Sequence, residues 1–579
     1  MKTTVETEWV TDLFDDHRPP DPSYGGLRDR LLARFHEWTR RPGVTTPVDE
    51  RALAERFVET AIPELPGSVE RYAQFVGDVL LPHSINLGSP RCLAHMTTNP
   101  PTFVPLLAEL CASLNQNLVK RDASRVMSLM ERQVLATMHR LAYGRAAGFY
   151  RRQVQARNTT LGIMTSCGTI ANATALWCAR SRLFPLTPTA PNVEHDGLKA
   201  VLDHYGCERA VILASDLAHY SIEKAAGRLG LGARNLLRVP VDACQRVDLR
   251  ALRRLVNRCR QRRWRIVAVV AVAGTTDCGS IDPLGAVAEI AAGEGVHYHV
   301  DAAWGGGLLL SSAHRDKLEG IERADSITVD AHKQLHLPTG LSLVLLRDPA
   351  MARAMEIEAN YMLRDNSGDL GRVSMEGSRP GMALFLHAAL QIFGRSGYAR
   401  LVDGSLERAG QFAELIRESA AFELLAEPQT NMVVYRYLPP AMRHRRLAGP
   451  FGRGANAALN RLTERLQQAQ YQAGSALVSR TTLTSLAEYP GQPIVCLRAV
   501  ISNPLTGEDD LRWVLEDQLR LGAQLEGRPG AGRCVTVPPA TGDARRAARA
   551  ASQPVYGDAT RRGGNGKLHV DGAAFSPAL

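Results

Sequence analysis

The chain has 579 residues, 45% of them hydrophobic, and its 69 Lys and Arg exceed its 59 Asp and Glu to give a formal net charge of +10. A chain of this length can bury a large core and is expected to form two or more domains. No apolar run approaches membrane-spanning length, and the first twenty residues lack the basic start and apolar stretch of a secretory signal, so we expect a cytoplasmic protein without a membrane partner.

The positive charge could indicate nucleic-acid binding, but its distribution argues against that class. From Arg528 onward there are eight Lys or Arg and three Asp or Glu, in a stretch rich in Gly, Ala and Pro. This composition predicts a disordered basic tail over 527–579. The rest is nearly balanced and has no recognised nucleic-acid motif. The ten cysteines include no CxxC pair, which predicts free thiols and no metal site.

The N-terminal segment, residues 1–85, is predicted to be mostly helical. Proline and glycine residues between Pro82 and Pro101 close it. Helical patterns are found in this segment and just after it, over 27–38, 50–60, 106–118 and 128–141.

From Gly162 short apolar runs alternate with longer amphipathic stretches, which predicts an α/β fold with a mainly parallel sheet. We expect this large domain over 86–392 and a smaller α/β domain over 393–526. Ligands of such sheets bind beyond the carboxyl ends of the strands. The predicted strands are 210–215, 266–273, 298–300, 327–329 and 341–346 in the large domain and 432–437 and 494–501 in the small one, with small-domain helices near 406–419 and 509–521.

The first candidate site is a turn of small residues, Thr165 to Asn172, at the start of a helical run. Small residues at a helix start expose backbone N–H groups, and the helix dipole favours an anion there. A phosphate beside Cys167, Gly168 and Thr169 is the natural ligand. An ordinary helix cap is the alternative.

Two strands end in residues that could contact a planar ring. His219 follows the strand 210–215 and can stack on a ring or transfer a proton. Thr276 follows the strand 266–273 and can hydrogen-bond a ring substituent. Each alone has a plainer interpretation, the first as one of sixteen histidines and the second as a capped strand end.

The next two strands end in groups with more specific chemistry. Asp301 is followed by the small Ala303, and a carboxylate beside a pyridine nitrogen keeps that nitrogen protonated. The following strand ends in His332 and Lys333, and lysine forms Schiff bases with carbonyl cofactors. The chain has only seven Lys against 62 Arg, so a lysine at this position is less easily a coincidence. A capping aspartate and a surface lysine are the alternatives.

Together these motifs resemble the group II pyridoxal-phosphate-dependent amino acid decarboxylases, and look closest to bacterial aspartate and glutamate decarboxylases. The family pattern HVDAA, followed some thirty residues later by HK, corresponds to His299–Ala303 and His332-Lys333, and the likeness extends from about Pro90 to Asn503. It implies an aspartate-aminotransferase-type fold, that is, pyridoxal-phosphate fold type I, in a homodimer.

The resemblance also implies residue roles. Lys333 holds the cofactor, Asp301 pairs with the ring nitrogen, and His219 stacks on the ring. Asp330-Ala331 is a departure, because many relatives have Asn-Pro before the His-Lys pair. The other implied cofactor-binding residues are Cys167, Gly168, Thr169, Thr276, Ala303 and His332.

Tyr361 matches a tyrosine that relatives place on a mobile loop some thirty residues after the lysine. In relatives it helps to protonate the substrate carbon after carbon dioxide leaves, as a general acid. A packed aromatic residue is the alternative.

The resemblance favours L-aspartate, giving β-alanine, with L-glutamate next. The segments Ser89–Thr97 and Leu114–Lys120 look like the N-terminal segments of bacterial aspartate or glutamate decarboxylases. A side-chain carboxylate needs a donor, and His95 and Arg379 are the candidates, since the arginine fork matches a carboxylate. A structural ion pair is the alternative for Arg379.

Two other functions remain open. Transamination or sulfur removal from cysteine would use the same lysine and aspartate. A non-catalytic protein of the same fold that binds a partner is an alternative of another class, and the intact set of motifs argues against it.

Overall fold

The computed structural model describes residues 22–41, 43–64, 69–185, 187, 189–357 and 367–527. They divide into two compact units, the first taking in residues 22–38, 48–64 and 69–82. Its helices are α2 (Pro22–Thr39), α3 (Glu50–Ala54), α4 (Val69–Phe75) and a short turn that continues α4 over Val76–Leu80.

Ion pairs of 2.6 Å, Arg30–Glu70 and Arg34–Asp78, join α2 to α4 and its continuation. The helix predicted over 50–60 is shorter in the structure, since α3 ends at Ala54 and a 3-10 turn follows to Phe57. No α3 residue is buried, so packing does not lengthen this helix.

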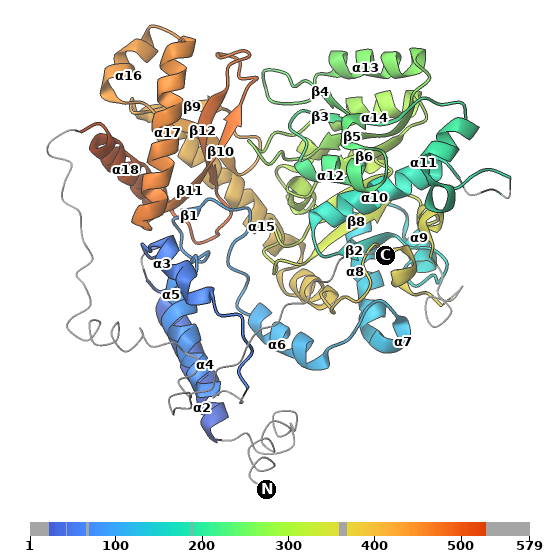
Figure 1. The fold of residues 1–579 in the computed structure, drawn as a ribbon, viewed down its shortest axis with the longest axis horizontal. Helices are drawn as coiled ribbons and strands as arrows, with labels where there is room; N and C mark the ends of the chain where they lie inside the picture. The colour runs from blue at the N-terminus through green and yellow to red at the C-terminus, as the bar shows by residue number, and fades with distance from the viewer. Residues whose placement is uncertain are drawn as a thin grey trace, which may run out of the picture. The chain divides into compact units, whose positions relative to one another are not determined.

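The second unit contains a seven-stranded sheet, which confirms the expected α/β class (Figure 1). Five neighbouring strands are parallel, and β8 runs antiparallel between β2 and β7. The strand order is β2 (Gly162–Thr165), β8 (Ser342–Leu346), β7 (Ser326–Asp330), β6 (His297–Asp301), β5 (Arg265–Val272), β3 (Ala210–Ser215) and β4 (Leu236–Val239).

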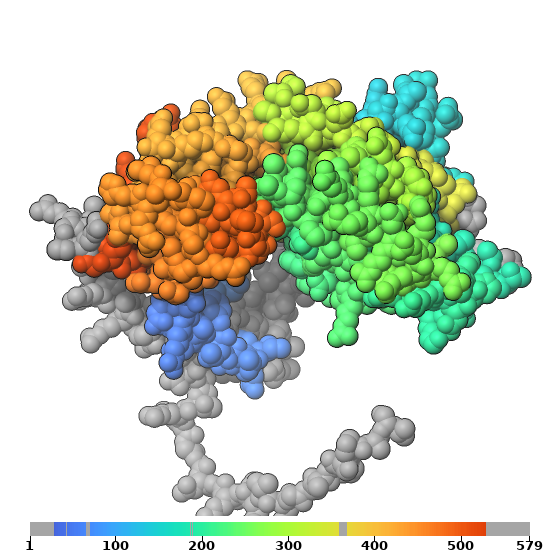
Figure 2. All heavy atoms as spheres, turned by 90° about the horizontal axis from the view of Figure 1, so that it is seen from above, coloured from blue at the N-terminus to red at the C-terminus, as the bar shows by residue number. Residues whose placement is uncertain are grey.

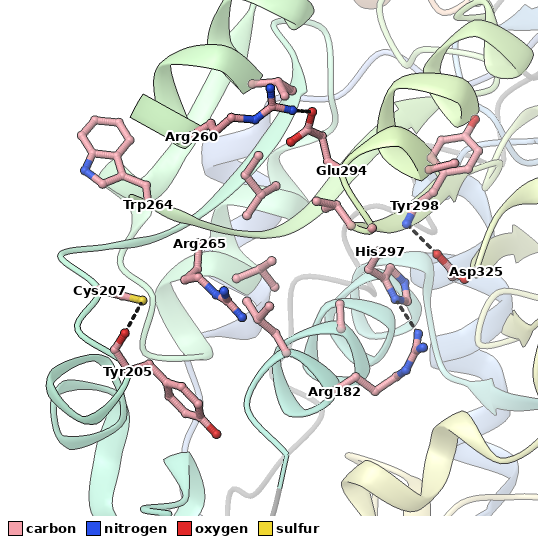
Figure 3. Close-up of a pocket in the computed structure, with 18 of the residues that line it drawn as sticks. Arg182, Tyr205, Cys207, Arg260, Trp264, Arg265, Glu294, His297, Tyr298 and Asp325 are labelled. Carbon is pink, nitrogen blue, oxygen red and sulfur yellow. Dashed lines mark hydrogen bonds and ion pairs between the residues drawn. The ribbon is translucent and has the colours of Figure 1, made fainter. Parts of the chain in front are cut away.

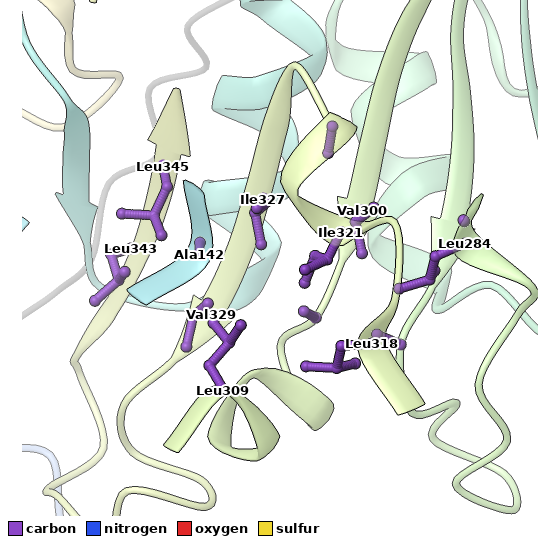
Figure 4. Packing of buried hydrophobic residues seen from close by; sticks show 14 of the residues in the cluster. Ala142, Leu284, Val300, Leu309, Leu318, Ile321, Ile327, Val329, Leu343 and Leu345 are labelled. Atoms are coloured by element: carbon purple, nitrogen blue, oxygen red, sulfur yellow. The ribbon is translucent and has the colours of Figure 1, made fainter. Parts of the chain in front are cut away.

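Both faces of this sheet are covered by helices, so the central strands are apolar on both sides. Alternate residues of β5 divide between two cores: Val269 and Ala271 pack on one face, Val270 and Val272 on the other. Figure 4 shows part of the first core. Helices α8 (Val126–Tyr143), α13 (Leu249–Gln261) and α14 (Leu284–Gly293) cover that face, and α10 (Gly168–Leu183) and α12 (Tyr220–Arg228) cover the other.

The predicted strands of the large sheet all exist, within two residues at each end. The strands β2 and β4 were not predicted. Each has four residues, too few to give a clear apolar run.

A second, mostly antiparallel sheet of five strands lies in the C-terminal part, and Figure 2 shows this part in orange as a lobe beside the green residues of the large domain. Its order is β1 (Cys92–Leu93), β11 (Leu477–Leu483), β12 (Ile494–Val500), β10 (Met432–Tyr437) and β9 (Phe422–Ala426). Helices α15 (Ala383–Glu418), α17 (Arg453–Ala473) and α18 (Glu508–Leu525) pack against it.

The helix predicted near 406–419 is the second half of the longer α15. This helix breaks at Gly394, where φ is 58°, next to the domain boundary that we predict at 392/393. The boundary itself stays a prediction. No helix within the described ranges is long and apolar enough to cross a membrane.

Candidate active site

Lys333 lies just beyond the carboxyl end of β7, in a cavity of about 250 Å³. Its Nζ is 3.0 Å from Oδ2 of Asp330, the last residue of the strand. The lysine side chain is 19% exposed and that of Asp330 2%, so the amine faces the cavity while its counter-charge is buried. An amine held at a cavity wall in this way can form a covalent bond to a carbonyl ligand.

Asp301 ends the neighbouring strand β6 and lines the same cavity. Its Oδ2 accepts a hydrogen bond of 2.8 Å from Asn172 Nδ2, and its Oδ1 accepts one of 3.1 Å from the N–H of Ala303. The two bonds fix the position of the carboxylate group. The side chain is therefore ready to pair with a cation in the cavity.

His219 is the N-cap of α12, and its Nδ1 accepts a hydrogen bond from the N–H of Ser221 at 3.3 Å. Burial lowers the pKa of His219, against the opposite effect of the nearby Asp301. An uncharged imidazole beside Lys333 suits stacking on a flat ring. Burial likewise lowers the pKa of His332, whose Nδ1 hydrogen-bonds the carbonyl of Leu341 at 3.0 Å.

The start of α10 lines the same cavity, with Cys167 as its N-cap and Gly168 and Thr169 as its first residues. The first N–H groups of a helix have no intrahelical acceptor, so they are available to an anion. A Cβ at Gly168 would lie 2.6 Å from Oδ2 of Asp330. Only glycine allows the helix start to come this close to the end of β7.

These groups fit pyridoxal phosphate: an amine for covalent attachment, a carboxylate, a neutral imidazole and a helix start for the phosphate. Two buried polar atoms at the cavity, Asp330 Oδ1 and Trp304 Nε1, have no hydrogen-bond partner among the described residues. The structure brings together all of the predicted cofactor-site residues, namely Cys167, Gly168, Thr169, His219, Thr276, Asp301, Ala303, His332 and Lys333.

The predicted substrate and proton-transfer residues have different outcomes. Both terminal nitrogens of Arg379 bind the carboxylate of Glu131, at 2.7 and 2.9 Å, and the two side chains are 9% and 0% exposed. This corresponds to the structural ion pair that was the alternative for Arg379, whose terminal nitrogens face a protein carboxylate. His95 is exposed, next to the cavity residue Met96. Tyr361 lies outside the described residues.

Arg498 was missed from the sequence. It lies on β12 and donates hydrogen bonds to the carbonyls of Thr276 and Ala94, on the large-domain side. It has no carboxylate within ion-pair distance among the described residues. No local pattern distinguishes it from the other arginines, because its partners are hundreds of residues away in the chain.

Asn172 was also missed as a site residue, although the sequence carried a signal for it. It lies four residues after Gly168 on α10, hence on the same helix face as the phosphate turn. An amide on that face, one turn into the helix, can reach the neighbouring strand end.

The sequence and the fold are similar to those of known proteins. A model of the pyridoxal-dependent decarboxylase conserved domain matches residues 52–438. Aspartate 1-decarboxylase of Aliivibrio fischeri is 37% identical over 516 residues, 89% of this chain and 94% of that relative. L-2,4-diaminobutyrate decarboxylase of Rhizobium meliloti is 31% identical over 472 residues, 80% of this chain and 84% of the relative. The crystal structure of mouse CSAD matches with a TM-score of 0.75 at 23% identity, over 87% of this chain and 99% of the other.

Proposed function

This chain belongs to the family of pyridoxal-dependent decarboxylases, and from that premise we propose that its substrate is L-aspartate, which it converts to β-alanine. Its fold is pyridoxal-phosphate fold type I, and it is an amino acid decarboxylase that uses pyridoxal phosphate, as the sequence predicts. The observation that carries the choice of substrate is the 37% identity to an aspartate 1-decarboxylase over 89% of the chain.

Bound pyridoxal phosphate supplies a protonated ring that accepts the electrons released as carbon dioxide leaves. We assign Lys333 to covalent attachment of the cofactor and, at the end of the reaction, to release of the amine product. Asp301, held in place by Asn172 and the N–H of Ala303, would pair with the ring nitrogen and keep its proton. His219, uncharged, would stack on the face of the ring. Protonation of the substrate carbon stays assigned to Tyr361, with His219 as the other candidate.

Arg498 supports an acidic substrate. Its guanidinium is only partly exposed, and burial lowers its pKa, while three of its N–H groups bind Ser479 and two carbonyls. Asp277 acts on this cation from beyond ion-pair distance. A partly buried cation with no carboxylate in direct contact is stabilised further by an anionic ligand. Arg498 and His95 lie close enough that the cation contributes to the lowered pKa of the histidine. We therefore propose Arg498, with His95, as the group that selects a substrate carboxylate.

L-glutamate is the alternative that shares this charge, and L-2,4-diaminobutyrate is the one suggested by the 31% identical relative. The test is a comparison of kcat/KM for L-aspartate, L-glutamate, L-2,4-diaminobutyrate and L-tyrosine. We expect L-aspartate to be preferred, and Arg498→Met to lower its kcat/KM by about a hundredfold, as for loss of a charged hydrogen-bonding partner.

The matched control is Arg480→Met, which removes an exposed arginine from the adjacent strand β11. It should leave kcat/KM unchanged. Preference for a basic or aromatic amino acid would contradict the proposal, and so would equal effects of the two variants.

We also propose that the enzyme is a homodimer. On α6 (Val104–Leu114) the residues Leu106, Leu110 and Leu114 are 66%, 47% and 45% exposed. Their spacing of four residues places them on one face of the helix, as an apolar stripe that a second copy would cover. Light scattering should give twice 63.1 kDa for the wild type and the monomer mass for Leu110→Glu. Leu505→Glu, at another exposed leucine, should remain dimeric. Location in the cytoplasm stays a prediction.

A further inference from the structure

A second and larger cavity lies at the other edge of the seven-stranded sheet, where the parallel strands begin (Figure 3). Its volume is about 1150 Å³. It is lined by the end of α13, the end of α14 and the first residues of β5 and β6. Because β6 runs from this cavity to Asp301, the two cavities are separated by the length of one strand.

The lining of this amino-edge cavity is strongly basic. Six arginines line it, together with two acidic residues, Glu294 and Asp325. Arg260 pairs with Glu294, and Arg347 with Asp325 at 2.6 Å. A third, Arg323, lies 3.8 Å from Glu289.

The other three arginines of the cavity, Arg182, Arg263 and Arg265, are exposed and have no carboxylate partner within the described ranges. Figure 3 shows Arg182 directed at His297 and Arg265 reaching into the space between the helices. Three cations that share one concave surface repel each other, and a multivalent anion bound among them removes that repulsion. Tyr205 and Trp264 form apolar walls beside them.

The floor of the cavity leads into the interior of the protein. His297, the first residue of β6, is buried, and burial lowers its pKa to about 3, so its ring is uncharged at neutral pH. Its Nδ1 accepts a hydrogen bond from Arg182 at 3.5 Å, which places its proton on Nε2. That Nε2–H lies 2.8 Å from the hydroxyl oxygen of Ser326, to which it donates.

The same chain of hydrogen bonds continues to the active site. The Ser326 hydroxyl donates to Nδ1 of His299 at 2.8 Å, and Nε2–H of His299 donates to Oδ1 of Asn172 at 3.1 Å. Asn172 then donates to Asp301 at 2.8 Å. The bonds from Arg182 to Asp301 all point the same way, from an arginine at the surface to the carboxylate at the cofactor site, and Asn172 also donates its other amide hydrogen to the Ser221 hydroxyl at 2.9 Å. Aligned bonds of this kind polarise one another in a buried environment.

We propose that the amino-edge cavity is a binding site for a small multivalent anion, phosphate-bearing or polycarboxylate, which acts on the cofactor site through the hydrogen-bond chain from Arg182 to Asp301. An anion that binds the Arg182 guanidinium draws it from His297, and each following bond changes in strength. The anion site does not depend on which amino acid is the substrate.

Calorimetric titration of the holoenzyme with inorganic pyrophosphate tests the site, because cofactor already fills the phosphate position of the active site. We expect one anion bound per chain. The triple variant Arg182→Ala/Arg263→Ala/Arg265→Ala should bind at least about tenfold more weakly. The control Arg250→Ala/Arg253→Ala/Arg254→Ala removes the same charge from exposed positions of α13 and should bind as the wild type does.

A parallel titration with citrate identifies the source of the charge: binding of pyrophosphate alone indicates a phosphate-bearing ligand, and binding of citrate alone indicates a polycarboxylate. Either result supports the site, as does binding of both. Binding of neither anion overturns the proposal, and so does an equal loss in the two triple variants. If the first triple variant fails to fold, the single charge reversal Arg265→Glu replaces it with the same expected loss.

Coupling to the cofactor is tested by its visible absorbance. Pyrophosphate should shift the absorbance band of the wild-type holoenzyme. Ser326→Ala cuts the chain midway and leaves the arginines in place, so this variant should bind pyrophosphate with unchanged affinity but show no shift. A wild-type spectrum that does not respond to bound anion, or a Ser326→Ala spectrum that responds fully, would contradict the coupling.

Discussion

The ion pair between Arg379 and Glu131 gives a prediction that separates a structural role from a substrate-binding role. The pair is bidentate at 2.7 and 2.9 Å, and Glu131 is fully buried. Arg379→Ala leaves that carboxylate in the interior without a counter-charge. Breaking a buried pair in this way costs about 3–5 kcal/mol, so we expect the free energy of unfolding to fall by that amount.

Urea unfolding followed by tryptophan fluorescence measures the loss, and KM for L-aspartate is measured on the folded fraction. KM should stay within about twofold of the wild type, because the guanidinium does not face the substrate. The control is Glu131→Leu/Arg379→Met, which replaces the pair by apolar side chains and should recover most of the stability. Wild-type stability of Arg379→Ala together with a large rise in KM would refute this reasoning and return Arg379 to the substrate site.

Three further predictions follow from the site and the core. Lys333→Ala should bind cofactor without covalent attachment, so the visible absorbance band of attached cofactor should disappear. The circular dichroism spectrum should be retained. The same absorbance band in the variant would assign attachment to another lysine. Gly168→Ala should weaken cofactor affinity at least tenfold in a fluorescence titration, since its Cβ would lie 2.6 Å from the Asp330 carboxylate, and an unchanged affinity would exclude this close approach. Burial lowers the pKa of His336 to about 4, below the ordinary 6.5 that it regains on unfolding. The unfolded chain therefore takes up a proton first, and the free energy of unfolding falls as pH drops from 6.5 to 4, by at most about 1.4 kcal/mol per pH unit for this residue. His336→Asn should lack this part of the pH dependence, and asparagine tolerates the φ of 59° at this position. If urea titrations between pH 6.5 and 4 gave the variant the same change of unfolding free energy with pH as the wild type, the prediction would be contradicted.

The cofactor site could be predicted because each of its groups lies at the end of a strand with a strong local pattern. Asp301 is the last residue of β6 and Lys333 lies three residues after the end of β7, and the carboxyl ends of neighbouring parallel strands meet at one edge of a sheet. The order of the motifs along the chain was therefore enough to predict that these groups lie together at one site. The small strands β2 and β4 lacked such a pattern and were not found.

The substrate side of the cavity could not be predicted in the same way. Neither Arg379 nor Arg498 lies in a segment with a distinctive local pattern. What separates their roles is whether a carboxylate from far away in the sequence contacts them in the fold. Arg379 has Glu131 beside it, 248 residues earlier, whereas Arg498 has no carboxylate within ion-pair distance among the described residues. Burial and pairing of a charge depend on tertiary packing, which periodicity does not report.

The same limit applied to the chain of hydrogen bonds behind Asp301. The alternation of His297, His299 and Asp301 along one strand places their side chains on one face and is visible in the sequence. The two residues that link them, Ser326 and Asn172, come from a neighbouring strand and a helix. Only the folded structure shows that they complete the chain.

The central claim, that this enzyme removes a carboxylate from L-aspartate, is tested most directly by product identification. The purified, cofactor-loaded enzyme is incubated with an equimolar mixture of the standard amino acids, and amines, keto acids and carbon dioxide are quantified by mass spectrometry. The account predicts β-alanine as the main product, with one carbon dioxide released for each molecule formed. A keto acid without carbon dioxide would contradict decarboxylation, and a different amine as the main product would contradict L-aspartate as the substrate.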